Sequence, residues 1–207
     1  DREVLGDRGD LGDRGAEATA SRFAVLSYLF RVGNAGIAFL SQIVLARLMG
    51  AHEFGIYVYV WTWVLLLATL TNLGLGSSPQ RFIPTYLARS DLDRLRGFLG
   101  GGRWLAFGVS AALGLLAGLG LVLFGEILQG WPVLPLLLGL ACLPFVVLTE
   151  VQGSIARSYD WADLAMAPPY LVRPVLMILI FLALVASGLP SDALSAMVAS
   201  LAACALT

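Results

Sequence analysis

Six long apolar segments constrain the fold of this chain more than any other feature of its sequence. They cover residues 23–46, 56–75, 104–124, 133–149, 170–187 and 193–207. A helix needs roughly 20 apolar residues to cross the hydrocarbon core of a membrane, and it satisfies its own backbone hydrogen bonds there. The sixth segment is too short to span a membrane alone, so we expect it to be truncated at Thr207. The sequence therefore predicts an all-α integral membrane protein.

The composition agrees with a chain that lies mostly in lipid. Hydrophobic residues make up 58% and charged residues 13% of the sequence, whereas soluble domains carry about 25% charged residues. The net charge of −1 predicts no nucleic-acid partner. Cys142 and Cys204 lie in apolar segments and are expected to be small buried side chains, and the single histidine, His52, lies in a short connection beside Glu53. Since no cluster of cysteine and histidine is present, we expect no metal site, and we expect no cofactor.

The distribution of arginine predicts the orientation in the membrane. Nine of the 13 basic residues, all arginine, lie in residues 1–22 and 77–103, and Arg157 lies in residues 152–169. The alternate connections hold only Arg47. Arginine-rich connections stay on the cytoplasmic side of a membrane. We therefore expect the N-terminus and these three stretches to be cytoplasmic.

The first residues differ in character from the rest of the chain. Residues 1–21 are polar and carry regularly spaced glycines, a composition that cannot bury enough apolar surface to fold. The sequence thus predicts a disordered cytoplasmic tail, followed by a transmembrane unit over residues 22–207.

A short helix is predicted between the second and third apolar segments. Ser90, followed by Asp91 and Asp93, is typical of a helix N-terminus, where a hydroxyl caps backbone N–H groups and acidic side chains favour the positive end of the helix dipole. Three leucines would then share one face of that helix: Leu92, Leu95 and Leu99. We expect an amphipathic helix lying on the cytoplasmic surface of the membrane.

Three polar side chains share one stripe of the first apolar segment. At about 100° per residue, Arg31, Asn34 and Gln42 lie on the same side of a helix. An arginine facing lipid costs about 2.5–3.5 kcal/mol, so the stripe is expected to face protein or a water-filled cavity. Alternatively, Arg31 extends to the headgroups, but that would not account for the two amides. We predict that these three residues bind the substrate.

Two aromatic pairs and one glutamate are further candidates. Tyr57 with Trp61, and Tyr59 with Trp63, are spaced by four residues, so each pair shares a helix face that either stacks on sugar rings or belongs to an interfacial aromatic belt. Glu150 ends the fourth segment, where it is either solvated at the interface or couples transport to an ion. With one histidine and no glycine-rich phosphate loop, we expect no protease site, no ATPase module and no catalytic residue.

Several stretches of the sequence resemble a known family. They are RLMGAHEFGIY, GLGSSPQRF, LARSDLDRLRGFL and GSIARSYDWADLAMAPPYLVRP. Together they are similar to bacterial polysaccharide biosynthesis proteins, the Wzx-like flippases of lipid-linked oligosaccharides. That superfamily also includes the lipid II flippases and the MATE multidrug exporters.

The resemblance implies a fold and an activity. It implies two six-helix lobes around a central cavity, of which this chain would be the N-terminal lobe, paired with a missing C-terminal half of the same polypeptide. It implies a multi-pass protein of the bacterial inner membrane that moves an undecaprenyl-pyrophosphate-linked oligosaccharide by alternating access, for surface polysaccharide biosynthesis. Membrane lipids would be its other partners.

Two alternative functions stay open from the sequence. One is an ion-coupled multidrug exporter of the MATE type, which would be expected to bury a carboxylate for its cationic cargo. Arg31, in a segment without an acid, favours the anionic pyrophosphate instead, since arginine holds phosphate through two parallel hydrogen bonds. The other is a membrane-embedded enzyme of polysaccharide assembly, which would need a set of acids and bases that the short connections do not offer.

Overall fold

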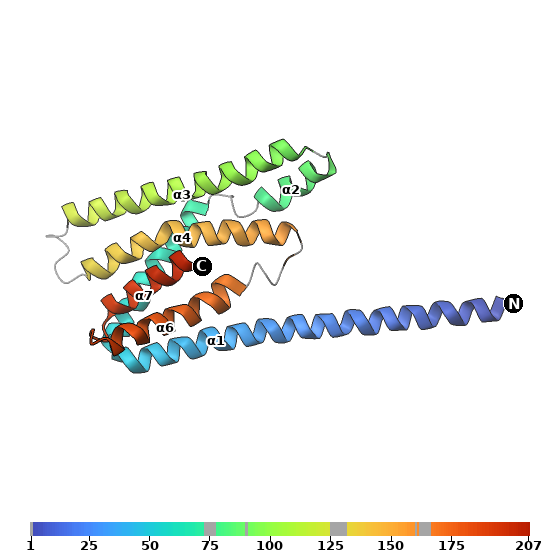
Figure 1. Cartoon of the computed structure of the whole chain (residues 1–207), viewed down its shortest axis with the longest axis horizontal. Coiled ribbons are helices and arrows are strands. Elements are labelled where there is room, and N and C mark those ends of the chain that lie inside the picture. The colour runs from blue at the N-terminus through green and yellow to red at the C-terminus, as the bar shows by residue number, and fades with distance from the viewer. Residues whose placement is uncertain (1, 73–77, 90, 125–131, 160, 162–166) are drawn as a thin grey trace.

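The structure is a computed structural model, and it describes residues 2–72, 78–89, 91–124, 132–159, 161 and 167–207. Within these ranges the side chains of residues 2–31, Asn34, Asn72 and Leu87 are not described. Every regular element in the described ranges is a helix, which confirms the predicted all-α fold. The elements are α1 (Arg2–Asn72), α2 (Ser78–Ala88), α3 (Leu92–Leu123), α4 (Val133–Ser158), the π-helix η1 (Pro168–Val172), α6 (Arg173–Ala186) and α7 (Ala193–Leu206) (Figure 1).

Four helical stretches in the described ranges are long and apolar enough to cross a membrane. They are Ala35–Thr71, Leu92–Leu123, Val133–Ser158 and Pro168–Ala186, and α7 is a shorter apolar helix. The first of these stretches contains a bend. The six predicted apolar segments therefore correspond to two arms of α1, to α3, to α4, to η1 with α6, and to α7.

A single residue divides α1 into its two arms. The backbone of Gly50 has φ 80° and ψ 166°, a conformation that glycine adopts without steric cost (Figure 1). We call residues 2–49 the first arm and residues 51–72 the second arm. His52 and Glu53, expected in a loop, instead lie in the first turn of the second arm, because the bend at Gly50 replaces the connection. The first arm includes residues 2–21, and the disorder predicted for them stays a prediction.

The connection before α3 differs from the prediction. The helix begins at Leu92 rather than Ser90, and its N-cap is Asp91, whose side chain accepts a hydrogen bond from the Arg94 backbone N–H at 3.3 Å. It then continues without a break to Leu123, so the predicted surface helix and the predicted third span are one helix. Glycine weakens a helix by about 1 kcal/mol per residue, but backbone groups near lipid find partners most easily within the helix itself. Ser90 lies outside the described residues.

The short helix between the second and third spans is α2, which the sequence analysis did not predict. It packs on the start of α3 through rings, with the Phe82 and Phe98 centroids 5.6 Å apart and the Tyr86 and Phe98 centroids 6.1 Å apart. Ile83 is fully buried beneath this cluster. Helix α2 and the first turns of α3 therefore form one packed unit.

Helix α4 lies at the centre of the described fold. It packs against α1, α2, α3 and α7. Gly139 of α4 makes room for this packing, because a Cβ there would lie 2.5 Å from Cγ1 of Val60 and 3.1 Å from Cγ2 of Val64. On its other side, a Cβ on Gly114 of α3 would lie 3.0 Å from the backbone oxygen of Leu140. Helices α1 and α3 thus approach α4 where one partner has no side chain.

Helix α7 is held at its N-terminus by two carboxylates. Asp192 accepts a hydrogen bond from the backbone N–H of Ser195 at 2.9 Å. Glu53, at the start of the second arm of α1, accepts one from the backbone N–H of Ala193, also at 2.9 Å. Free N–H groups at a helix start are common partners for carboxylates. Glu53 therefore links the bend of α1 to α7.

Candidate functional site

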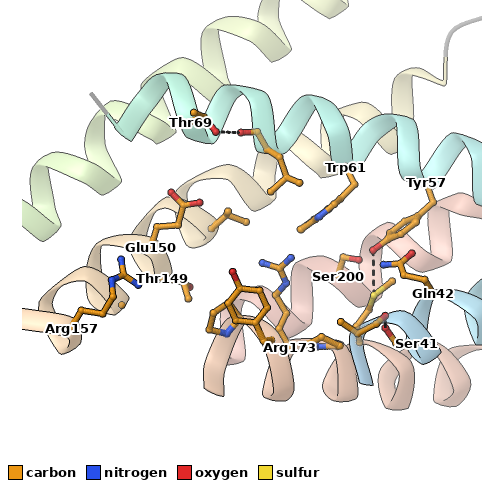
Figure 2. A pocket seen from close by; sticks show the side chains of 18 residues that line it. Ser41, Gln42, Tyr57, Trp61, Thr69, Thr149, Glu150, Arg157, Arg173 and Ser200 are labelled. Atoms are coloured by element: carbon orange, nitrogen blue, oxygen red, sulfur yellow. Dashed lines mark hydrogen bonds between the residues drawn. The ribbon is translucent and has the colours of Figure 1, made fainter. Parts of the chain in front are cut away.

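A cavity of about 640 Å³ lies among the membrane helices. Both arms of α1, together with α4, η1, α6 and α7, contribute side chains to its wall (Figure 2). The wall combines hydroxyl, amide, charged and aromatic groups with apolar ones. Such a mixed wall inside a bundle of apolar helices marks the cavity as the candidate site, since polar groups in a membrane face an interior rather than lipid.

The first arm of α1 presents the predicted polar stripe in part. Gln42 lines the cavity, and so does Ala38, which precedes it by four residues on the same arm. On the other side of the arm, Leu40 is 61% and Val44 39% exposed, as expected for a face toward lipid. The side chains of Arg31 and Asn34 are outside the described ones.

Glu150 of α4 also lines the cavity. The predicted fourth span ends at residue 149, but α4 continues to Ser158, so Glu150 lies within the helix and not at its edge. The predicted fourth connection is shorter for the same reason. The roles predicted for Gln42 in substrate binding and for Glu150 in ion coupling stay predictions.

Two arginines that were not predicted to bind a ligand also line the cavity. Arg157 lies near the end of α4, and Arg173 is the first residue of α6. The guanidinium carbon of Arg173 lies 4.5 Å from the ring centroid of Trp61, on the second arm of α1. Figure 2 shows the guanidinium directed from α6 toward the indole. The cavity thus has one cationic side chain from α4 and one from α6.

The aromatic pair Tyr57 and Trp61 forms part of this wall. Their rings are nearly parallel, at 12°, with centroids 6.4 Å apart. Tyr57 is only 4% exposed, and its hydroxyl donates a hydrogen bond to Sδ of Met177 at 3.4 Å. The spacing of four residues had predicted a shared face, but only the fold shows that this face meets α6.

A π-helix precedes Arg173. The backbone N–H of Arg173 donates to the carbonyl of Pro168, five residues earlier, instead of four as in an α-helix. This wide turn shifts the register of α6 relative to a continuous α-helix, and such turns are frequent at functional sites. Pro168 and Pro169 lack an N–H, which costs nothing in the first turn of a helix, where these donors have no partner within the helix. The hydropathy pattern of the sequence does not predict this π-helical turn.

The serine and threonine hydroxyls of the wall donate hydrogen bonds within their own helices. Thr69 donates to the carbonyl of Leu65 at 2.8 Å, and Thr149 donates to that of Phe145 at 2.9 Å. Such bonds let a hydroxyl lie in a membrane helix at little cost while its lone pairs still face the cavity. The wall can therefore accept hydrogen bonds from a polar ligand.

The charged groups described in the wall are two arginines and one glutamate: Arg157, Arg173 and Glu150. Their sum is one positive charge. No group of three or more histidine, cysteine or acidic residues that could hold a metal ion is found among the described residues. The arrangement suits a ligand with an anionic part and hydroxyl groups.

Comparison with known proteins gives one match. A family model described as polysaccharide biosynthesis protein matches residues 23–206. The matched range includes every residue that lines the cavity. Comparisons with curated proteins and with solved structures give no match.

Proposed function

The chain belongs to the polysaccharide biosynthesis protein family, and on that premise we propose that it flips an undecaprenyl-pyrophosphate-linked oligosaccharide across the bacterial inner membrane by alternating access. The family match, over residues 23–206, and the apolar helices make it a multi-pass membrane protein of polysaccharide biosynthesis. The cargo and the transport mechanism are the proposal.

The observation that carries the proposal is the composition of the cavity wall. A pyrophosphate leaving water needs cationic hydrogen-bond donors, and arginine provides them in a planar array that matches phosphate. Two arginines line the cavity, together with hydroxyl and amide groups that suit a glycan. The volume of about 640 Å³ lies within the range of roughly 300–1,000 Å³ found for ligand pockets.

The predicted orientation supports the same direction of transport. With the N-terminus in the cytoplasm, Arg157 lies near the cytoplasmic end of α4, where the newly made lipid-linked glycan would enter. We further propose that Arg31, Asn34 and Gln42 contact the cargo, and that a C-terminal lobe closes the other side of the cavity. The membrane lipids surround the outer faces.

Among the described residues of the cavity wall, Glu150 is the one that favours an alternative function, a multidrug exporter. A carboxylate in the cavity is what a cation-coupled multidrug exporter of the MATE type would use. The two arginines of the same wall would repel a cationic drug, so the charge balance favours an anionic cargo. An enzyme of polysaccharide assembly is the alternative from a different class.

One experiment separates these functions. The full-length protein is expressed in a strain that lacks its own flippase, and surface polysaccharide is measured with the leaflet distribution of the lipid-linked oligosaccharide. We expect restored polysaccharide and movement of the precursor to the outer leaflet. Drug resistance without restored polysaccharide would favour the exporter, and a change in glycan length without movement would favour an enzyme.

A further inference from the structure

Arg173 has its charged group on an aromatic face rather than on an acid. Its guanidinium lies over Trp61, and both side chains line the cavity. None of the carboxylates in the described part of the chain forms an ion pair with it. A cation over a ring is attracted through the ring's face, and the five N–H donors of guanidinium lie in its own plane. Contact with the ring face therefore leaves guanidinium N–H groups of Arg173 that can donate hydrogen bonds to a ligand.

Two contacts one helical turn apart fix this geometry. Trp61 meets Arg173, and Tyr57 meets Met177, so the pairs form successive rungs between the second arm of α1 and α6. The buried Tyr57 ring lies beside Trp61 and limits its movement. The rungs fix the start of α6 against the second arm of α1. The Arg173 guanidinium is thus positioned before any ligand arrives.

We propose that Arg173, held by Trp61, forms an anion subsite for the diphosphate group of the cargo. The inference rests on the proposed function and assigns its most polar contact to α6. Trp61 is a positioning residue, since it touches the guanidinium and acts through it. The ring face under Arg173 is not open to a sugar, so the glycan does not stack there.

Arg157 and Glu150 act on the same ligand at longer range. Both line the cavity from α4, whereas Arg173 reaches it from α6 (Figure 2). The net positive charge of the three groups attracts a diphosphate, and the planar donors of Arg173 bind it with defined geometry. Lysine at position 173 would keep the charge but lose this geometry and the stacking on Trp61.

The test is binding of undecaprenyl pyrophosphate to the purified full-length protein in phosphatidylcholine nanodiscs. We expect Arg173→Ala to weaken binding at least tenfold, and Arg173→Lys to recover only part of the loss. The matched control is Arg103→Ala, because Arg103 is an exposed arginine of α3 that does not line the cavity. Unchanged affinity in Arg173→Ala would overturn the proposal.

The positioning role of Trp61 has its own readout. Trp61→Phe keeps a ring face and should retain most of the affinity, while Trp61→Leu should lose several-fold. If Trp61 acts through Arg173, then Trp61→Leu has little further effect in the Arg173→Ala background. Equal losses from Trp61→Leu in both backgrounds would show a merely structural role.

Additional arms identify the anion and separate the two proposals. Inorganic pyrophosphate should compete with the lipid in wild type, and nanodiscs with added phosphatidylglycerol should not reduce binding. If phosphatidylglycerol alone competes, Arg173 binds a phospholipid headgroup and the proposed diphosphate subsite is wrong.

If the wild-type protein restores polysaccharide export but Arg173→Ala binds the lipid normally, the subsite proposal is wrong while the proposed function stands. If wild type neither binds the lipid nor restores export, the proposed function fails.

Discussion

Gly139 of α4 faces the second arm of α1 at close range. A side chain there would meet Val60 and Val64, which are β-branched, nearly fully buried and unable to move aside easily. This single position therefore sets how near the two helices lie, and with it one wall of the cavity.

We predict that Gly139→Ala destabilises the protein by about 1–3 kcal/mol, because the added Cβ overpacks this contact. Thermal unfolding in detergent measures the change. Gly108→Ala is the matched control, since nothing lies within 4 Å of a Cβ at that helical position. Adding Val60→Ala should return part of the stability, and equal melting temperatures for Gly139→Ala and Gly108→Ala would contradict the argument.

Glu53 is a second residue whose side chain joins two helices. Its carboxylate accepts the backbone N–H of Ala193, at the first turn of α7. We predict that Glu53→Ala lowers the free energy of unfolding by about 0.5–2 kcal/mol, the usual range for loss of a cap. Glu53→Gln keeps an acceptor oxygen and should cost less. Identical thermal stability of all three proteins would show that the contact contributes nothing.

At the scale of elements, α3 combines two roles in one helix. Its first turns pack on α2, and the rest crosses the membrane. The three leucines predicted to face lipid are not equivalent, since Leu95 is 6% exposed and Leu92 is 52% exposed. The leucine face that was predicted to lie on the membrane surface therefore packs partly against protein, through Leu95.

This difference gives a test within one helix. Leu95→Ala should cost about 2–5 kcal/mol of stability, because a buried leucine leaves a cavity. Leu92→Ala should cost less than about 1 kcal/mol, since that side chain is exposed on the protein. Limited proteolysis of α2 should become faster only in Leu95→Ala. Equal protease sensitivity of both variants would mean that α2 and α3 do not form one packed unit.

At the scale of the whole molecule, the bundle places residues from distant parts of the chain around one cavity. Helix α4 lies between α3 on one side and α1 with α7 on the other (Figure 1). The bend at Gly50 and the carboxylate of Glu53 lie at the end of the bundle where α7 begins, and Arg157 lies toward the other end of α4. In the predicted topology the end with Arg157 is cytoplasmic, and the end with Gly50 and Glu53 lies on the opposite side of the membrane.

The topology predicts opposite labelling at the two ends. In a background without Cys142 and Cys204, a membrane-impermeant maleimide added from outside should label cysteine placed at His52 or Ser191. It should not label cysteine at Ser158 until the membrane is opened. The reverse pattern would place the N-terminus outside and remove the entry route proposed near Arg157.

The class of fold and most of the helices could be predicted from local sequence. Runs of apolar residues at spanning length are a local signal, because each helix in lipid must satisfy its own backbone. Helix periodicity predicted that Gln42 lies on a stripe facing protein or a cavity, and Gln42 lines the cavity. The local sequence also predicted the helix start near Asp91, one residue early.

Which of these groups meet depends on how the helices pack against one another. Arg173 and Trp61 are far apart in the sequence, and they meet because α6 packs against the second arm of α1. The close approach at Gly139 and the capping of α7 by Glu53 depend likewise on how helices cross. Hydropathy predicts that a segment lies in the membrane, because it is a property of that segment alone. It does not predict which helices the segment contacts, because those contacts depend on the side chains of several segments together.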